Sequence, residues 1–162
     1  MCKQLKNVRL NEGLEVLGAK QVTDGKEFEG EVFAYSAVES VLLPSTLKRV
    51  EAGTFRECKY LKSIDLPDNV EYIGSECFCN SGIEQATLPI ALRDIGENAF
   101  RQCEKLKIAW VEGDCADRIR SCVDESVAII QVTQKTVGGK LLFDIRRQKD
   151  VVIPEGVQEI GE

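Results

Sequence analysis

Seven cysteines and a complete lack of histidine limit the chemistry that this chain can perform. Cysteine can act as a nucleophile or a metal ligand, but without histidine the chain lacks the usual general base and the commonest metal ligand. Cys77 and Cys79 have one residue between them, whereas zinc-binding pairs usually have at least two, and no second pair follows. We therefore expect no metal site.

The same cysteines give little support to disulfides or thiol catalysis. Cys115 and Cys122 lie two turns apart on a predicted helix, too far for a disulfide. An odd count leaves at least one free thiol, as in a reduced protein or one whose thiols are packed away from oxidant. A nucleophilic cysteine needs a base or an electropositive setting, and neither is visible. A thiol or redox enzyme, with the outward-facing Cys79 as its reactive group, stays a remote alternative.

The charge and composition exclude further classes of function. The net charge of −6 argues against general binding to nucleic acid or to anionic membranes. The chain has no apolar run long enough for a membrane-spanning helix, so we expect no insertion into a membrane. Gly138 and Gly139 indicate a turn and not a phosphate-binding loop, and the carboxylates are scattered with the surface charge. We expect neither an enzyme nor a cofactor.

The elements that position these residues come from a repeat. Residues 38–60, 61–82 and 83–105 repeat one apolar pattern, and their opening residues follow at intervals of 23, 22 and 23 residues. A period in the low twenties is typical of stacked-repeat solenoids. The positions that recur together are Val38, Leu61, Ile83 and Leu106, then Pro44, Pro67 and Pro89, then Phe55, Phe78 and Phe100.

Within a unit, alternation predicts a short strand. Ile64 and Leu66 should face the core, with Ser63 and Asp65 on the other side and Pro67 ending the strand. Neighbouring units would pair these strands into a parallel ladder.

Glycine and phenylalanine mark the rest of each unit. Gly74 and Gly96 predict a sharp bend, and the segment that carries the phenylalanine predicts a short helical or 3₁₀ turn. The expected structural core contains these phenylalanines and small residues at a neighbouring position, namely Phe55, Phe78, Phe100, Cys58 and Cys103.

The pattern extends in both directions as a single solenoid over residues 1–162. We divide it into units 5–37, with a polar insert near 20–30, then 38–60, 61–82, 83–105, an irregular unit 106–149 and a truncated unit 150–162. The irregular unit reads as a short helix capped by Asp114, with Ile119 and Cys122 on its inner side, followed by two strands around Gly138 and Gly139. We expect a piece of a longer protein whose uncapped coils associate end to end.

The units resemble the BspA-like leucine-rich repeat family, whose pattern is L-x-x-I-x-[IL]-P-x-x-[VL]-x-x-I-G-x-x-A-F-x-x-C. It is carried by Leu61, Ile64, Leu66 and Pro67 and by IGENAFRQC at 95–103, and the match covers roughly residues 5–17, 31–111 and 150–162. The resemblance implies a β-rich α/β fold, a right-handed leucine-rich-repeat solenoid. Many such proteins are bacterial or protist surface proteins implicated in adhesion, so the resemblance suggests a cell-surface or secreted location. The asparagine of many leucine-rich repeats is not repeated, because its position holds Thr46, Asn69 and Ala91.

The outward strand positions are the best candidates for a ligand face. The expected face contains Arg9, Leu42, Ser63, Asp65, Gln85, Thr87, Ile108 and Trp110. Tryptophan and arginine are enriched in binding hot spots, but Trp110 could equally be covered by the segment that follows it. The sequence therefore predicts a non-enzymatic module that binds a protein or a glycan, and the alternative is a spacer that carries other domains.

Overall fold

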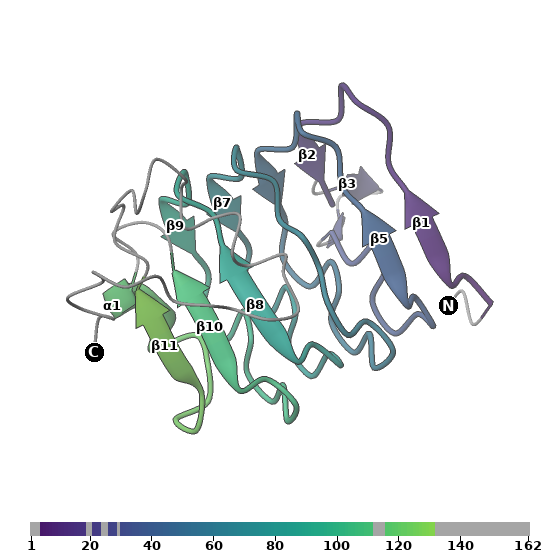
Figure 1. Ribbon diagram of the computed structural model, residues 1–162. Helices are drawn as coiled ribbons and strands as arrows, with labels where there is room; N and C mark the ends of the chain where they lie inside the picture. The colour runs from purple at the N-terminus through teal and green to yellow at the C-terminus, as the bar shows by residue number, and fades with distance from the viewer. Residues whose placement is uncertain (1–3, 19–20, 24–25, 29, 112–115, 132–162) are drawn as a thin grey trace.

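The chain winds into stacked coils, and each coil contributes short strands to parallel ladders (Figure 1). The computed structural model describes residues 4–18, 21–23, 26–28, 30–111 and 116–131. The first ladder contains β1 (Asn7–Arg9), β5 (Ser40–Leu42), β8 (Gln85–Leu88), β10 (Ile108–Val111) and β11 (Ala128–Gln131). The second contains β2 (Val16–Leu17), β6 (Arg49–Val50), β7 (Tyr72–Ile73) and β9 (Asp94–Ile95). The parallel strands, the few helices and the coil period together confirm a β-rich repeat fold.

Two further elements depart from the regular coil. Within the predicted insert, β3 (Gln21–Thr23) and β4 (Lys26–Phe28) pair antiparallel as a hairpin. In the unit that we expected to be irregular, α1 (Ala116–Ile119) precedes β11, and Ile119 and Cys122 are buried. β11 pairs parallel with β10, so the coil stack continues past the point where the sequence pattern breaks. Asp114, Cys115, Gly138, Gly139 and residues 150–162 lie outside the described residues.

The first ladder is interrupted at residues 61–66, where we expected a strand. β1 pairs with β5, and β8, β10 and β11 pair with one another, but no strand joins the two sheets in the described chain. Leu61 and Ile64 are still buried, and Ser63 and Asp65 are still exposed. The expectation of a paired strand was wrong because alternating burial reports side-chain packing, whereas a ladder also needs backbone bonds to both neighbours.

Stacked phenylalanine rings form the centre of the core. The ring centroids of Phe33 and Phe55 lie 5.4 Å apart, those of Phe55 and Phe78 also 5.4 Å, and those of Phe78 and Phe100 4.9 Å. All four rings are buried. One ring per coil therefore gives each coil an aromatic contact with its neighbours, which a single coil could not make.

The segments that carry these rings, which we expected to be short helical or 3₁₀ turns, form successive hydrogen-bonded turns and no helix. The Cys58 amide donates to the Phe55 carbonyl at 3.2 Å, which closes one turn. Two residues after each phenylalanine, the chain adopts a positive φ of 60° at Glu57, 57° at Asn80 and 59° at Gln102. A right-handed helix cannot continue through a residue in that conformation, so α1 is the only helix among the described residues.

Gly74 and Gly96 have a different role from the predicted bend. Neither has a positive φ, but a Cβ added to Gly74 would lie 2.2 Å from the Ala52 amide nitrogen. A Cβ on Gly96 would lie 2.2 Å from the Ser75 amide nitrogen. Glycine is needed here because adjacent coils approach too closely for any side chain.

Buried serine and cysteine side chains alternate along the stack. The Cys58 thiol donates to the Phe33 carbonyl at 3.0 Å and lies 3.6 Å from the Ser36 hydroxyl. Cys103 repeats this arrangement with the Phe78 carbonyl at 3.1 Å and Ser81 at 3.5 Å.

For these buried serine and cysteine side chains, the repeating unit is therefore a module of two coils. Its length is 45 residues, the interval that separates Ser36 from Ser81 and Cys58 from Cys103. The same interval relates Glu39 to Glu84, Pro44 to Pro89, Phe55 to Phe100, Arg56 to Arg101 and Lys62 to Lys107.

Candidate binding face

The outward side chains of the first ladder form a continuous surface on each side of its interruption. On the first side, Asn7 pairs with Ser40 and Arg9 with Leu42. The Ser40 hydroxyl donates to the Asn7 side-chain carbonyl at 2.6 Å. Arg9 and Leu42 are exposed, and Leu42 keeps 58% of its surface accessible although it is aliphatic.

On the other side of the interruption, three strands bring the predicted residues into two rows. Gln85 pairs with Ile108, and Thr87 pairs with Trp110. Trp110 also pairs with Ile130 of β11 and is half-buried between these neighbours. The side chain is therefore neither fully covered nor free, which is an intermediate outcome between the two alternatives.

Ser63 and Asp65 lie in the unpaired segment between the two sheets. Both are exposed, as Arg9, Leu42 and Gln85 are. The structure thus places six of the eight predicted residues in strands and these two in the gap.

Sequence reasoning missed two members of this surface, Ala128 and Ile130. They pair with Ile108 and Trp110, whereas the intervening Ile129 packs against the core. The same alternation that placed Trp110 outward would have placed Ile130 outward. We use the term strand face for the outward set Arg9, Leu42, Ser63, Asp65, Gln85, Thr87, Ile108, Trp110, Ala128 and Ile130.

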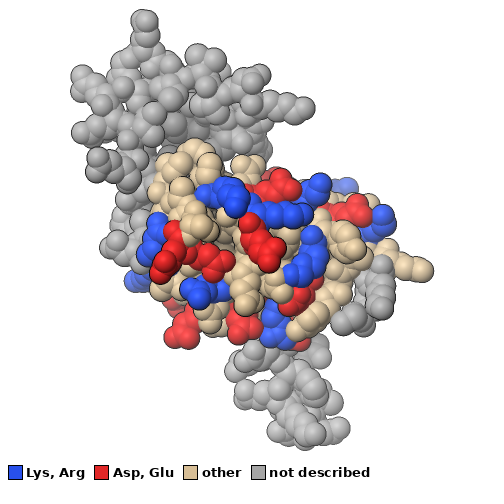
Figure 2. Space-filling view, turned by 90° about the horizontal axis from the view of Figure 1, so that it is seen from below, with Lys and Arg blue, Asp and Glu red and all other residues tan. Residues whose placement is uncertain are grey.

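Charge is concentrated beside the strand face and not on it. Arg9 and Asp65 are the charged members of the face. Just before the first ladder, backbone hydrogen bonds connect Lys6 to Glu39, Lys62 to Glu84 and Glu84 to Lys107, so that charge alternates from coil to coil. A second alternating row precedes the other ladder and contains Glu15, Lys48, Glu71 and Arg93. Figure 2, a view from below, shows acidic and basic side chains interspersed over the surface.

The described thiols are poorly suited to chemistry. Burial raises the pKa of Cys58, Cys103 and Cys122, and raises that of Cys77 well above its ordinary value. Half-buried Cys79 also has a raised pKa, first because of burial and then because of the nearby Glu76 carboxylate. A raised pKa keeps a thiol protonated and therefore weakly nucleophilic.

The described residues contain neither a metal-binding cluster nor a membrane-spanning helix. No group of three or more acidic or cysteine side chains there is arranged to hold a metal ion. Among the helices of the same residues, none has the length and apolar character needed to cross a bilayer.

The comparisons with known proteins agree on the repeat. The model of the "BspA type Leucine rich repeat region" matches residues 26–134 in six copies. A leucine-rich repeat protein from T. pallidum has a similar structure, with a TM-score of 0.51 and 26% identity, over 64% of this chain and 44% of that one. One from Bacteroides ovatus has the same fold, with a TM-score of 0.55 and 19% identity, over 79% of this chain and 37% of that one.

This chain thus spans less than half the length of either similar structure. No curated protein matches it. Proteins of this fold are generally not enzymes. The family model covers well over half of the sequence, and the chain belongs to the BspA-type leucine-rich repeat family.

Proposed function

We propose that this protein is a non-enzymatic binding module that holds a protein ligand against its strand face. The observation that carries the proposal is the register of the first ladder. It places exposed Leu42 beside Arg9, and half-buried Trp110 between Thr87 and Ile130. Repeat proteins commonly bind along such an extended face.

The chemistry of the face favours a protein over a glycan. Leu42, Ile108 and Ile130 are aliphatic, and Trp110 adds a large aromatic surface. The centres of protein interfaces are depleted in charge and enriched in aromatic residues, and this face has little charge compared with the rows beside it. The family resemblance favours a partner at a cell surface and a role in adhesion.

None of the residues that form the repeat is needed for this binding. Phe55, Phe78, Cys58 and Cys103 are buried and packed against neighbouring coils. The side chains that differ from coil to coil are therefore the ones that remain available to a ligand.

The test is a selection of phage-displayed peptides on the immobilised chain, repeated on single variants. Leu42→Ala and Trp110→Ala should each weaken the selected peptides about tenfold or more, as hot-spot residues do. Asp94→Ala is the matched control, because Asp94 is also exposed in a strand but lies in β9 of the second ladder. It should leave binding unchanged.

Thermal melting of each variant separates binding from folding. Leu42→Ala should leave the melting temperature unchanged, since the side chain is 58% exposed. If Trp110→Ala sharply lowers the melting temperature, Trp110 is needed for folding. In that case only Leu42→Ala tests the binding proposal. Peptides that bind equally well to all variants, or no enrichment at all, would favour a spacer.

A further inference from the structure

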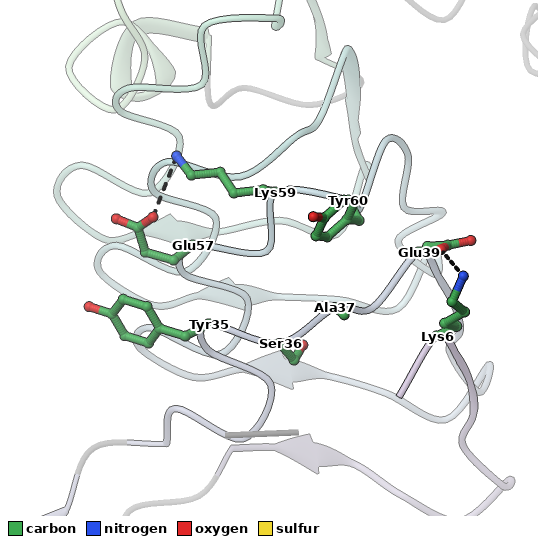
Figure 3. A pocket seen from close by; sticks show the side chains of 8 residues that line it. All are labelled: Lys6, Tyr35, Ser36, Ala37, Glu39, Glu57, Lys59 and Tyr60. Atoms are coloured by element: carbon green, nitrogen blue, oxygen red, sulfur yellow. Dashed lines mark ion pairs between the residues drawn. The ribbon is translucent and has the colours of Figure 1, made fainter. Parts of the chain in front are cut away.

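A pocket away from the strand face lies where the turns lead into the first strands. It has a volume of about 590 Å³, within the range of small-molecule sites. Its lining comes from two successive units, 5–37 and 38–60, and contains Lys6, Tyr35, Ser36, Ala37, Glu39, Glu57, Lys59 and Tyr60 (Figure 3).

At the pocket, a short coil lies beside a longer one. The chain reaches the opening apolar residue of the next unit, Val38, two residues after Ser36, but needs three residues from Cys58 to Leu61. Ala37, with only a methyl group, stands at this point in the short coil. In Figure 3, Ser36 and Ala37 lie between the two tyrosines.

Packing of the repeat does not require these two tyrosines. Tyr35 is 43% exposed and Tyr60 is 61% exposed. One module later, at an interval of 45 residues, the equivalent positions hold Asn80 and Lys105. Ser36, Glu39 and the short coil recur in that second module, but the aromatic pair does not. The Arg56 guanidinium lies over the Tyr35 ring, 5.4 Å from its centroid, so one face of that ring already has a partner. Tyr60 is the part of this pocket that the scaffold leaves unexplained.

The charged groups around the tyrosines are already neutralised by one another. Lys6 Nζ lies 2.9 Å from Glu39, and Lys59 Nζ lies 3.4 Å from Glu57. Asn80 of the next coil donates to Glu57 at 2.6 Å, and its carbonyl accepts from Lys59. With two cations and two carboxylates, the lining has no net charge and attracts neither anions nor cations strongly.

These groups fit one class of ligand. We propose that the pocket binds a neutral carbohydrate of one or two sugar rings. The apolar C–H face of a sugar packs on an aromatic ring, and tyrosine supplies a rigid ring with a polar hydroxyl. Sugar hydroxyls both donate and accept hydrogen bonds, and the pocket holds lysine side chains as donors and glutamate side chains as acceptors.

The experiment uses the full chain with ¹³C-labelled tyrosine rings. The chain has three tyrosines, and Tyr72 in β7 serves as an internal reference. Lactose, maltose and N,N′-diacetylchitobiose are titrated separately. We expect at least one of them to shift the ring signals of Tyr35 and Tyr60 and to leave Tyr72 unchanged.

Variants then tie the signal to the pocket. Tyr60→Ala should weaken the active saccharide about tenfold, the loss expected for one aromatic contact. Tyr35→Asn should weaken binding by a similar factor, because it also removes one ring. The substitution should not disturb the backbone, since asparagine at the equivalent position 80 adopts the same positive φ, 57° at both sites. Lys105→Ala is the matched control in the second module, and Leu42→Ala is the control on the strand face. Neither should change saccharide binding.

The proposal is overturned if no saccharide shifts either ring, or if affinity survives in both tyrosine variants. It is also overturned if Nα-acetyl-lysine amide, which keeps its charged ε-ammonium group, binds more tightly than every saccharide. The pocket would then recognise a cation. Binding of ovalbumin, measured before and after enzymatic removal of its glycans, shows whether the sugar ligand is carried on a protein or is free in solution. Binding of the glycosylated form alone supports a sugar carried on protein, and binding of free saccharides alone supports a soluble one.

Discussion

The buried cysteine and serine pairs show how single residues serve the stack. Cys58 and Cys103 each donate to the carbonyl of a phenylalanine in the coil before, beside a serine hydroxyl. A buried thiol packs as a small hydrophobe and gives a second hydrogen bond to a carbonyl that already accepts one from a serine amide, Ser36 to Phe33 and Ser81 to Phe78. The repetition of cysteine is thus explained by packing, without any redox or metal chemistry.

Burial of these thiols predicts that stability falls at alkaline pH. An unfolded cysteine ionises near pH 8.5, whereas burial raises the pKa of Cys77 well above its ordinary value. The folded chain holds its proton where the unfolded chain releases it, so the stabilisation is complete below about pH 8.5 and is lost above it. The urea midpoint of the native chain should be level from neutral pH and then decline.

The variant Cys77→Ala isolates this effect. Alanine fits the site, because Ala99 occupies the equivalent position of the next coil and is fully buried. The midpoint of Cys77→Ala should decline less above about pH 8.5 than that of the native chain. Cys79→Ala, at a half-buried site, should give a smaller difference. Parallel declines in all three proteins would contradict the assignment.

At the scale of elements, the sequence predicted which way side chains face better than which backbones pair. Alternation placed Ile64 inward and Asp65 outward, and both are so arranged. The interruption of the ladder at that segment could not be predicted, because backbone pairing depends on how neighbouring coils approach. The segments after the second ladder were predicted to be short helical or 3₁₀ turns for a similar reason, because their residue types do not indicate a positive φ at Glu57 or Gln102.

The candidate site divides in the same way. The repeat phase was enough to place Thr87 beside Trp110. It was not enough to find the pocket at Tyr35 and Tyr60, which depends on a difference of one residue between adjacent coils. That difference is visible in the sequence as two residues from Ser36 to Val38 and three from Cys58 to Leu61, but only the folded chain shows the space beside it.

Close approach of coils predicts a large cost for a single methyl group. In Gly74→Ala the new Cβ would lie 2.2 Å from the Ala52 amide nitrogen, so backbone would have to move. We expect a loss of about 3 kcal/mol in the free energy of unfolding, at the upper end for overpacking. Gly13→Ala is the control. Its φ is +97°, but nothing lies within 4 Å of the added Cβ, so we expect about 1 kcal/mol from the backbone alone.

Urea denaturation of both variants measures these costs. If Gly74→Ala costs no more than Gly13→Ala, the approach between coils is looser than the structure indicates. If Gly13→Ala loses more free energy of unfolding than Gly74→Ala, then backbone conformation, rather than crowding between coils, determines how much a glycine substitution destabilises this fold.

At the scale of the whole molecule, the module of two coils explains why opposite charges meet along the stack. The row Lys6, Glu39, Lys62, Glu84 and Lys107 alternates in sign, and so does the row Glu15, Lys48, Glu71 and Arg93. Two contacts in these rows are close ion pairs, Lys6 with Glu39 at 2.9 Å and Lys48 with Glu15 at 3.0 Å. Each exposed pair contributes little to the free energy of unfolding. We infer that the alternating rows act mainly by favouring one order of neighbouring coils over another.

This alternation predicts that the chain accepts an added pair of coils only in the right order. Duplicating residues 38–82 after position 82 keeps both rows alternating. Inserting two copies of residues 61–82 at the same point adds the same number of coils, but places Lys62 beside Lys62 and Glu71 beside Glu71. Each like-charge contact costs roughly 0.5 kcal/mol. Four such contacts should make the second variant less stable by about 2 kcal/mol, measured by urea denaturation at low salt. In high salt the difference should shrink, because screening weakens repulsion between exposed charges. If the two variants are equally stable at low salt, the alternation has no part in stacking, and the difference in coil length alone defines the module.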